Sequence, residues 1–158
     1  MNINRRAPVV ARQSVVVRTP ADAVWRLLTD VDRWPTWNPD IRRAELRGAL
    51  IQNAVFHWEC DEWCISSRVH EVIPLRKLAW SGQAGDLMAL QVWTLVPTAD
   101  GITVQVEESW EGPSVTSQAR EIQRVVDRSL VRWLAFLKDD VEDSVRFVQF
   151  VMKERDAI

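Results

Sequence analysis

The feature of the sequence that most constrains its fold is a long apolar stripe at helical spacing in its last third. Apolar residues recur there at intervals of three and four, as one face of an amphipathic helix requires. The stripe comprises Ile122, Val126, Leu130, Trp133, Leu137, Val141, Val145, Val148 and Met152. One helix from Val115 to Glu154 would be about 60 Å long, roughly twice the width of a small domain. We therefore expect a helix that either breaks near "KDDVED" (138–143) or projects from the fold.

The segments before this stripe alternate polar and apolar residues at the period of a β-strand. One strand is expected over residues 9–17 and six more after residue 40, ending with "ITVQVEESWEG". Between them, "TPADAVWRLLTD" predicts a short helix with Thr19 as its N-cap and Pro20 as its first residue. A sheet needs one apolar face covered, and only the long helix is large enough to cover it. We predict an α+β fold in which a curved antiparallel sheet of about seven strands wraps around the C-terminal helix, with short helices after the first strand.

Composition narrows the class of protein further. The 158 residues are 47% hydrophobic and 27% charged, which is typical of one globular domain. We expect a single domain over 1–158, with a core of about 9–142 and a helical extension over 143–158. A formal charge of -2 without a basic cluster argues against a nucleic-acid partner. No apolar run is long enough for a signal peptide or a membrane span, so we expect a cytoplasmic protein.

Tryptophan is the unusual residue, with nine Trp and no Tyr. Each Trp brings a large apolar surface and one N–H group that needs a partner when buried. Nine of them suggest a large interior surface, and they would either line a cavity or fill it. Trp34 and Trp37 lie in "RWPTWNP", where Pro35 and Pro39 prevent a long helix or strand.

Strand alternation predicts which side chains face the interior. The candidate ligand contacts are Trp34, Trp37, Phe56, Trp58, Ser67, Trp80, Gln91, Trp93, Trp110 and Trp133. Glu108 is expected among these tryptophans, where burial would raise its pKa and let it donate a proton or bind a carbonyl. The alternative is a structural carboxyl held by Gln91, Ser67 or an arginine such as Arg42 or Arg120. His57 and His70 fall on the outer, solvated face.

A metal site is not expected. "HWECDEWC" brings His57, Glu59, Cys60 and Cys64 together, but its C-x3-C spacing and missing proline differ from a zinc deaminase signature. We predict no metal and no other cofactor. The two cysteines are expected as reduced thiols, with a disulfide between them as the less favoured alternative.

Several stretches together carry a resemblance to a known superfamily. These are "TPADAVWRLLTDVDRWPTWNPDI", "FHW", "SRVHEVIPLRKLAWSG", "VWTLVP", "DGITVQVEES" and "LVRWLAFLKDDVE". In their order the chain resembles START-like, Bet v 1-like (SRPBCC) proteins and their polyketide cyclase/dehydrase-like domains. The resemblance implies a helix-grip fold with a deep cavity between sheet and helix, which Trp34 and Trp37 close at one end. Asn53 replaces a glycine that relatives commonly have before the third strand, and Asn tolerates the same left-handed backbone.

These observations lead to three hypotheses about function. The first is binding of a hydrophobic or aromatic small molecule, with polyketide cyclase or dehydratase activity as the reaction if there is turnover. The second is a non-catalytic carrier or sensor, and the third is a protein-interaction module using the C-terminal tail. The tail carries Phe147, Val148, Phe150, Val151 and Met152, which we expect to pack on a second copy or on the chain's own sheet edge. A homodimer would form through Phe147, Phe150 and Val151.

Overall fold

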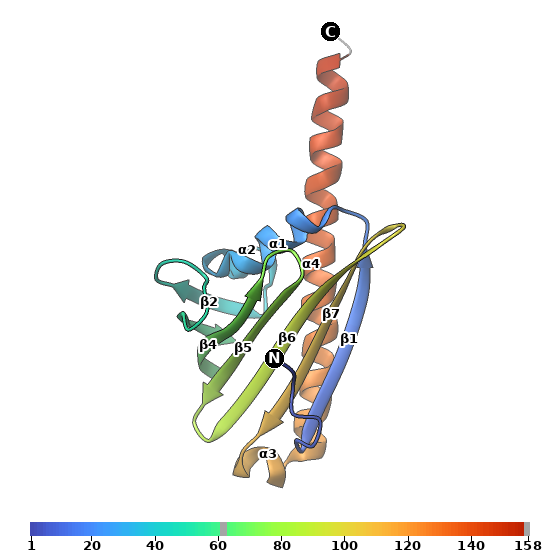
Figure 1. The fold of residues 1–158 in the computed structure, drawn as a ribbon. Helices are drawn as coiled ribbons and strands as arrows, with labels where there is room; N and C mark the ends of the chain where they lie inside the picture. Colours follow the sequence, from blue (N-terminus) through green and yellow to red (C-terminus); the bar gives the residue numbers. More distant parts are fainter. Residues whose placement is uncertain (61–62, 157–158) are drawn as a thin grey trace.

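The computed structural model describes residues 1–60 and 63–156, except for the side chains of residues 145, 150, 151 and 153–156. A curved antiparallel sheet wraps around one long helix (Figure 1). The strands are β1 (Val9–Val17), β2 (Ile41–Leu46), β3 (Val55–Cys60), β4 (Trp63–Ile73), β5 (Lys77–Ala84), β6 (Leu87–Thr98) and β7 (Gly101–Glu111). The helices are α1 (Ala21–Thr29), the 3-10 turn η1 (Val31–Arg33), α2 (Trp34–Trp37), α3 (Pro113–Ser117) and α4 (Ala119–Asp156).

The sheet has seven strands in the order β1-β7-β6-β5-β4-β3-β2, and every neighbouring pair is antiparallel. This confirms the predicted helix-grip architecture. The short helices α1 and α2 lie at the end of the sheet where α4 leaves it (Figure 1). Asn53 has φ of 70°, so the left-handed backbone expected at this position is present.

The start of α1 differs from the prediction by one residue. Pro20 keeps an extended backbone, with ψ of 152°, and the helix begins at Ala21. Thr19 therefore does not cap the helix, and its hydroxyl lies 3.2 Å from the carbonyl of Pro20, to which it donates. Asp22 is in the first turn as expected and pairs with Arg26 at 3.1 Å.

The long helix packs its predicted stripe against the concave face of the sheet. The buried members are Val126, Leu130, Trp133, Leu137 and Val141. The helix begins later than expected, because Gln118 leaves helical geometry (φ -122°, ψ 24°) and separates α3 from α4. It does not break at residues 138–143, so of the two alternatives the projecting helix is the observed one.

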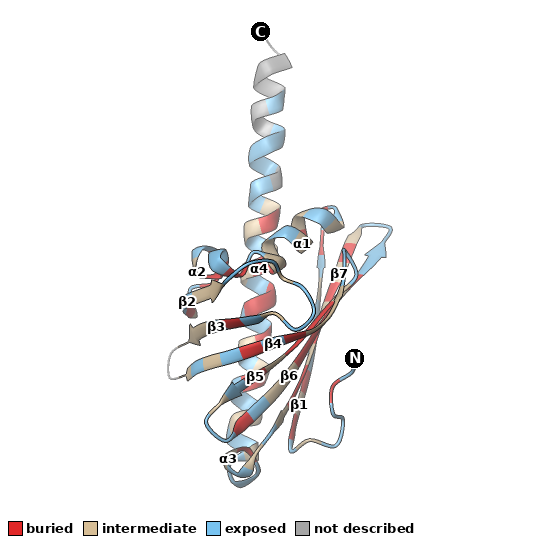
Figure 2. Cartoon of the chain, turned by 60° about the vertical axis from the view of Figure 1, so that its left-hand side comes forward, coloured by how far each residue is buried: buried red, intermediate tan, exposed pale blue. Residues whose placement is uncertain are grey.

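Beyond the sheet, the side chains of α4 that the structure describes are exposed. Burial along the helix changes from buried to exposed where it leaves the sheet (Figure 2). The exposed fractions are 69% for Phe147, 55% for Val148 and 61% for Met152, so these residues do not pack on the chain's own sheet edge as one alternative had it. The side chains of Phe150 and Val151, named in the same prediction, lie outside the described residues.

Candidate ligand-binding site

A cavity of about 610 Å³ lies between the concave face of the sheet and α4. Five tryptophans line it, together with apolar residues of the sheet and of the first turns of α4. The tryptophans are Trp58, Trp63, Trp80, Trp110 and Trp133. Cavities of this volume are typical of sites for small organic ligands.

Small side chains on the inner face of the sheet leave room for the cavity. Gly82, Ala84 and Ala89 all line it, and Gly82 lies directly opposite Ala89 in the pairing of β5 with β6. A larger residue at either alanine would extend into the same volume. The cavity therefore depends on the short side chains of β5 and β6 as much as on the tryptophans around them.

Glu108 is the buried carboxyl of this cavity, with 8% of its surface exposed. It lies opposite Gln91 in the pairing of β6 with β7, and the Gln91 amide donates to Oε1. The indole Nε1 of Trp110, two residues along β7, donates to Oε2 at 2.7 Å. Burial raises the pKa of Glu108 to about 7, although the hydrogen bond from Trp110 acts to lower it.

The partners of Glu108 correspond only in part to those expected. Gln91 and Ser67 were both predicted partners; Gln91 donates to the carboxyl, whereas the hydrogen bond of the Ser67 hydroxyl is one accepted from Trp58 Nε1 at 3.0 Å. Trp110 was expected as a ligand contact and not as a donor to Glu108. Both hydrogen bonds to the carboxyl come from neutral groups, so neither donor supplies a positive charge to offset its ionisation.

The closed end of the cavity is filled by a cluster of aromatic rings. Trp34 packs at its centre, with ring centroids 5.2 Å from Trp133, 5.7 Å from Trp80 and 5.5 Å from Phe56. Its indole N–H donates to the carbonyl of Leu28 at 3.0 Å. The cluster comprises Trp34, Trp37, Phe56, Trp58, Trp80, Trp93 and Trp133. The tryptophans thus do both things that the sequence allowed: some fill one end of the interior, and others line the space that remains.

Five of the predicted ligand contacts lie outside the cavity lining. These are Trp34, Trp37, Phe56, Ser67 and Trp93. Alternation placed Phe56, Ser67 and Trp93 on the inner face of the sheet, where all three are buried but do not line the open volume. Trp58, Trp80, Gln91, Trp110 and Trp133 do line it, together with Glu108.

The lining of the cavity also contains residues that sequence reasoning did not select. Trp63 packs edge-on against Trp110, with centroids 5.4 Å apart. Asp40 accepts two hydrogen bonds from the Arg132 guanidinium, at 2.5 and 2.6 Å, and both residues line the cavity. Alternation back from Ile65, which is expected on the concave face, could have identified Trp63, whereas no local pattern pairs Asp40 with Arg132.

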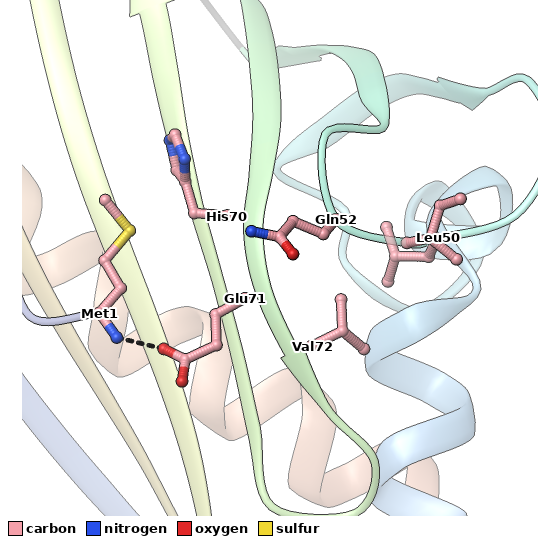
Figure 3. Close-up of a pocket in the computed structure, with 7 residues that line it drawn as sticks. Met1, Leu50, Gln52, His70, Glu71 and Val72 are labelled. Atoms are coloured by element: carbon pink, nitrogen blue, oxygen red, sulfur yellow. Dashed lines mark hydrogen bonds and ion pairs between the residues drawn. The ribbon is translucent and has the colours of Figure 1, made fainter.

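A second depression, of about 540 Å³, lies on the outer face of the sheet (Figure 3). Met1 and Glu71 point toward each other across it and form an ion pair, and Lys77 pairs with the same carboxylate at 2.9 Å. His70, also in its lining, hydrogen-bonds Ser81 at 2.8 Å, and His57 is exposed, so both histidines are on the outer face as predicted. The charged groups of this depression, the N-terminus, Glu71 and Lys77, are paired with one another. We therefore take the tryptophan-lined cavity as the candidate site.

Within residues 1–60 and 63–156, no group of three or more His, Cys, Asp or Glu side chains is placed to hold a metal ion. Cys64 is an exposed free thiol, so the disulfide between the two cysteines, which was the less favoured alternative, is not formed. No helix in the same part of the chain is long and apolar enough to cross a membrane.

The fold and its internal cavity define a START-like protein of the helix-grip class. The chain belongs to the polyketide cyclase / dehydrase and lipid transport family, whose model matches residues 8–142. No curated protein sequence matches the chain.

Solved structures of low sequence identity share the fold. A hypothetical protein, jhp0584 from Helicobacter pylori, is 18% identical with a TM-score of 0.78, covering 88% of this chain and 91% of that one. The Zhui aromatase/cyclase from Streptomyces sp. R1128 is 22% identical with a TM-score of 0.72, covering 86% and 94%. A START superfamily protein from Mycobacterium smegmatis is 18% identical with a TM-score of 0.66, covering 85% and 97%.

Proposed function

We propose that the protein binds a hydrophobic or aromatic small molecule that carries one oxygen function, a carbonyl or a hydroxyl. The observation that supports this most is a tryptophan-lined cavity of about 610 Å³ with one buried carboxyl in its wall. The aromatic walls supply binding through apolar contact, and the carboxyl supplies orientation. Trp58, Trp80, Trp110 and Trp133 are the ligand contacts in this proposal.

Glu108 gives the site its polar chemistry. With a pKa of about 7, its carboxyl is divided between protonated and ionised forms near neutral pH. The protonated form donates a hydrogen bond to a carbonyl of the ligand, and the ionised form accepts one from a hydroxyl. Gln91 and Trp110 hold the carboxyl in place through the hydrogen bonds that they donate.

The same group supports polyketide cyclase or dehydratase activity as a second candidate function. A carboxyl with a pKa near the working pH is suited to transfer a proton, and a rigid aromatic cavity would hold a flexible substrate in a folded conformation. The family description and the aromatase/cyclase neighbour favour this candidate. If Glu108 only hydrogen-bonds the ligand and transfers no proton, the protein is a non-catalytic carrier or sensor.

Paired neutral probes test the ligand proposal. 2-Naphthol and naphthalene differ by one hydroxyl, and quenching of tryptophan fluorescence reports their binding. We expect wild type to bind 2-naphthol about fivefold more tightly, since one hydrogen bond contributes about 1 kcal/mol. Glu108→Leu should bind the two equally. Binding of neither probe to wild type would contradict the ligand proposal, and an unchanged preference in the variant would contradict the role of Glu108.

The proposed site needs no metal and no other cofactor, and its partner is a small molecule. A cytoplasmic location stays a prediction from the sequence. Self-association is a separate proposal, because it depends on the projecting part of α4 and not on the cavity.

A further inference from the structure

The contacts of α4 with its own sheet end shortly after Lys138. The ammonium of Lys138 donates to the carbonyl of Val16 at 2.9 Å, and the Glu142 carboxylate accepts from the backbone N–H of Arg18 at 3.1 Å. From residue 143 the helix continues to Asp156 beyond the sheet (Figure 2). These 14 or so residues span about 21 Å.

The apolar stripe that packs on the sheet does not stop where the sheet stops. Val141 is buried with 3% exposed, whereas Val148 and Met152, further along the same stripe, are 55% and 61% exposed. Phe147 lies beside them and is 69% exposed. A helix of this length is marginal in water by itself, and a continuous apolar stripe of this kind marks an interaction surface.

The spacing of the stripe is that of a two-helix coil. Val145, Val148 and Met152 are separated by three and four residues, which corresponds to heptad positions a, d and a. In an antiparallel pair, position a of one helix packs against position d of the other. Met152 of each copy then meets Val148 of the second copy, so the pattern is complementary to itself.

The charges favour the antiparallel arrangement over the parallel one. Residues 139–143, "DDVED", contain four acidic residues and no basic one. Residues 146–155, "RFVQFVMKER", contain three basic residues and one acidic one. In this register the acidic position 143 of one copy lies close to the basic position 155 of the other, and the basic position 146 lies opposite the acidic position 154. A parallel pair places each basic position opposite itself.

We propose that two copies of the chain associate through residues 143–156 of α4 as an antiparallel helix pair. A second copy fits better than a membrane surface, because the segment lacks the excess of lysine and arginine with which interfacial helices bind anionic lipids. The two sheets then lie at opposite ends of the pair, with their cavities apart. An interface of this length is at the small end for proteins, so we expect a dimer that dissociates on dilution.

Sedimentation equilibrium of the full chain tests the association. Wild type should show a monomer–dimer equilibrium, and Val148→Asp or Met152→Asp should weaken the dimer at least tenfold. Val131→Asp is the matched control, because Val131 is 52% exposed on the part of α4 that covers the sheet. A wild type that is monomeric at all accessible concentrations, or that is monomeric and binds anionic vesicles, would overturn the proposal. So would a dimer that survives both substitutions in folded protein.

Spin labels test the orientation. The label is placed by Asp156→Cys, with Cys60→Ser and Cys64→Ser to remove the native thiols. The antiparallel pair separates the two labelled positions by about 20 Å along the axis, whereas a parallel pair brings them to about the interhelical distance of 10 Å. A long distance that disappears with Val148→Asp supports the proposal, and a short distance overturns the antiparallel arrangement.

Discussion

Gln91 and Glu108 face each other across β6 and β7, and the amide of Gln91 donates to the buried carboxyl of Glu108. The two residues lie in a wall otherwise made mostly of apolar and aromatic side chains. A carboxyl in such a wall is costly to ionise, and this cost makes Glu108 the group through which pH acts on the site.

Protein stability should therefore fall as pH rises through the titration of Glu108. The folded pKa is about 7 and the ordinary value is 4.5, so the folded state binds the proton more tightly than the unfolded state. The free energy of unfolding then decreases between about pH 4.5 and 7 and is level above that range. A shift of this size corresponds to about 3 kcal/mol. Urea unfolding of wild type and Glu108→Gln at pH 5 and pH 8 measures the difference, and equal pH dependence in the two proteins would refute it.

Trp110 should hold the pKa of Glu108 down. Its indole N–H donates to the carboxyl at 2.7 Å, which favours the ionised form. Trp110→Phe removes this donor and should move the pKa of Glu108 upward, as measured by the NMR chemical shift of the carboxyl carbon. Trp63→Phe, which changes the neighbouring ring but no donor to Glu108, is the control. A pKa that stays the same or falls in Trp110→Phe would contradict the assignment.

Filling the cavity should abolish ligand binding and leave the fold intact. Ala89 lines the cavity on β6, so the ring of Ala89→Phe would occupy the open volume. We expect the affinity for 2-naphthol to fall at least tenfold. Met88→Phe adds the same ring at the next position, which points outward and is 49% exposed, and should bind normally. Equal affinities for the two variants would place the bound molecule elsewhere.

The aromatic cluster should contribute mainly to stability. Trp34 has no exposed surface and contacts several rings, so Trp34→Ala should lower the free energy of unfolding by about 3 to 5 kcal/mol. Trp25→Ala, on the half-buried side of α1, should cost less. Urea unfolding compares the two. A loss at Trp34 no larger than that at Trp25 would show that the cluster is not the packed core described here.

The sequence predicted the architecture well, because periodicity determines which face of each element is apolar. Alternation along β7 was enough to place Glu108 inside, and the helical stripe was enough to place Trp133 against the sheet. Alternation does not predict which of the inward-facing side chains contact the open volume of the cavity. Phe56 and Trp93 face inward as expected, but whether they touch the open volume depends on rings from α2 and α4, which are distant in the sequence.

Individual side-chain contacts and backbone angles were also not predictable from the sequence pattern. Trp110 is two residues from Glu108 on the same face of β7, a spacing that allows their contact but does not require it. The ion pair of Asp40 with Arg132 joins residues 92 positions apart, so only the tertiary fold brings them together. The start of α1 depended on the backbone angle of Pro20, which sequence preferences describe only on average.

Native mass spectrometry of freshly purified wild type and Ala89→Phe, each incubated with 2-naphthol, is the most direct test of the cavity. We predict one non-covalently bound small molecule per chain in wild type and none in Ala89→Phe, with both adduct-free masses correct under denaturing conditions. Wild type that carries no adduct, or an adduct that is equally abundant in both proteins, would contradict the proposal that the tryptophan-lined cavity is the ligand site.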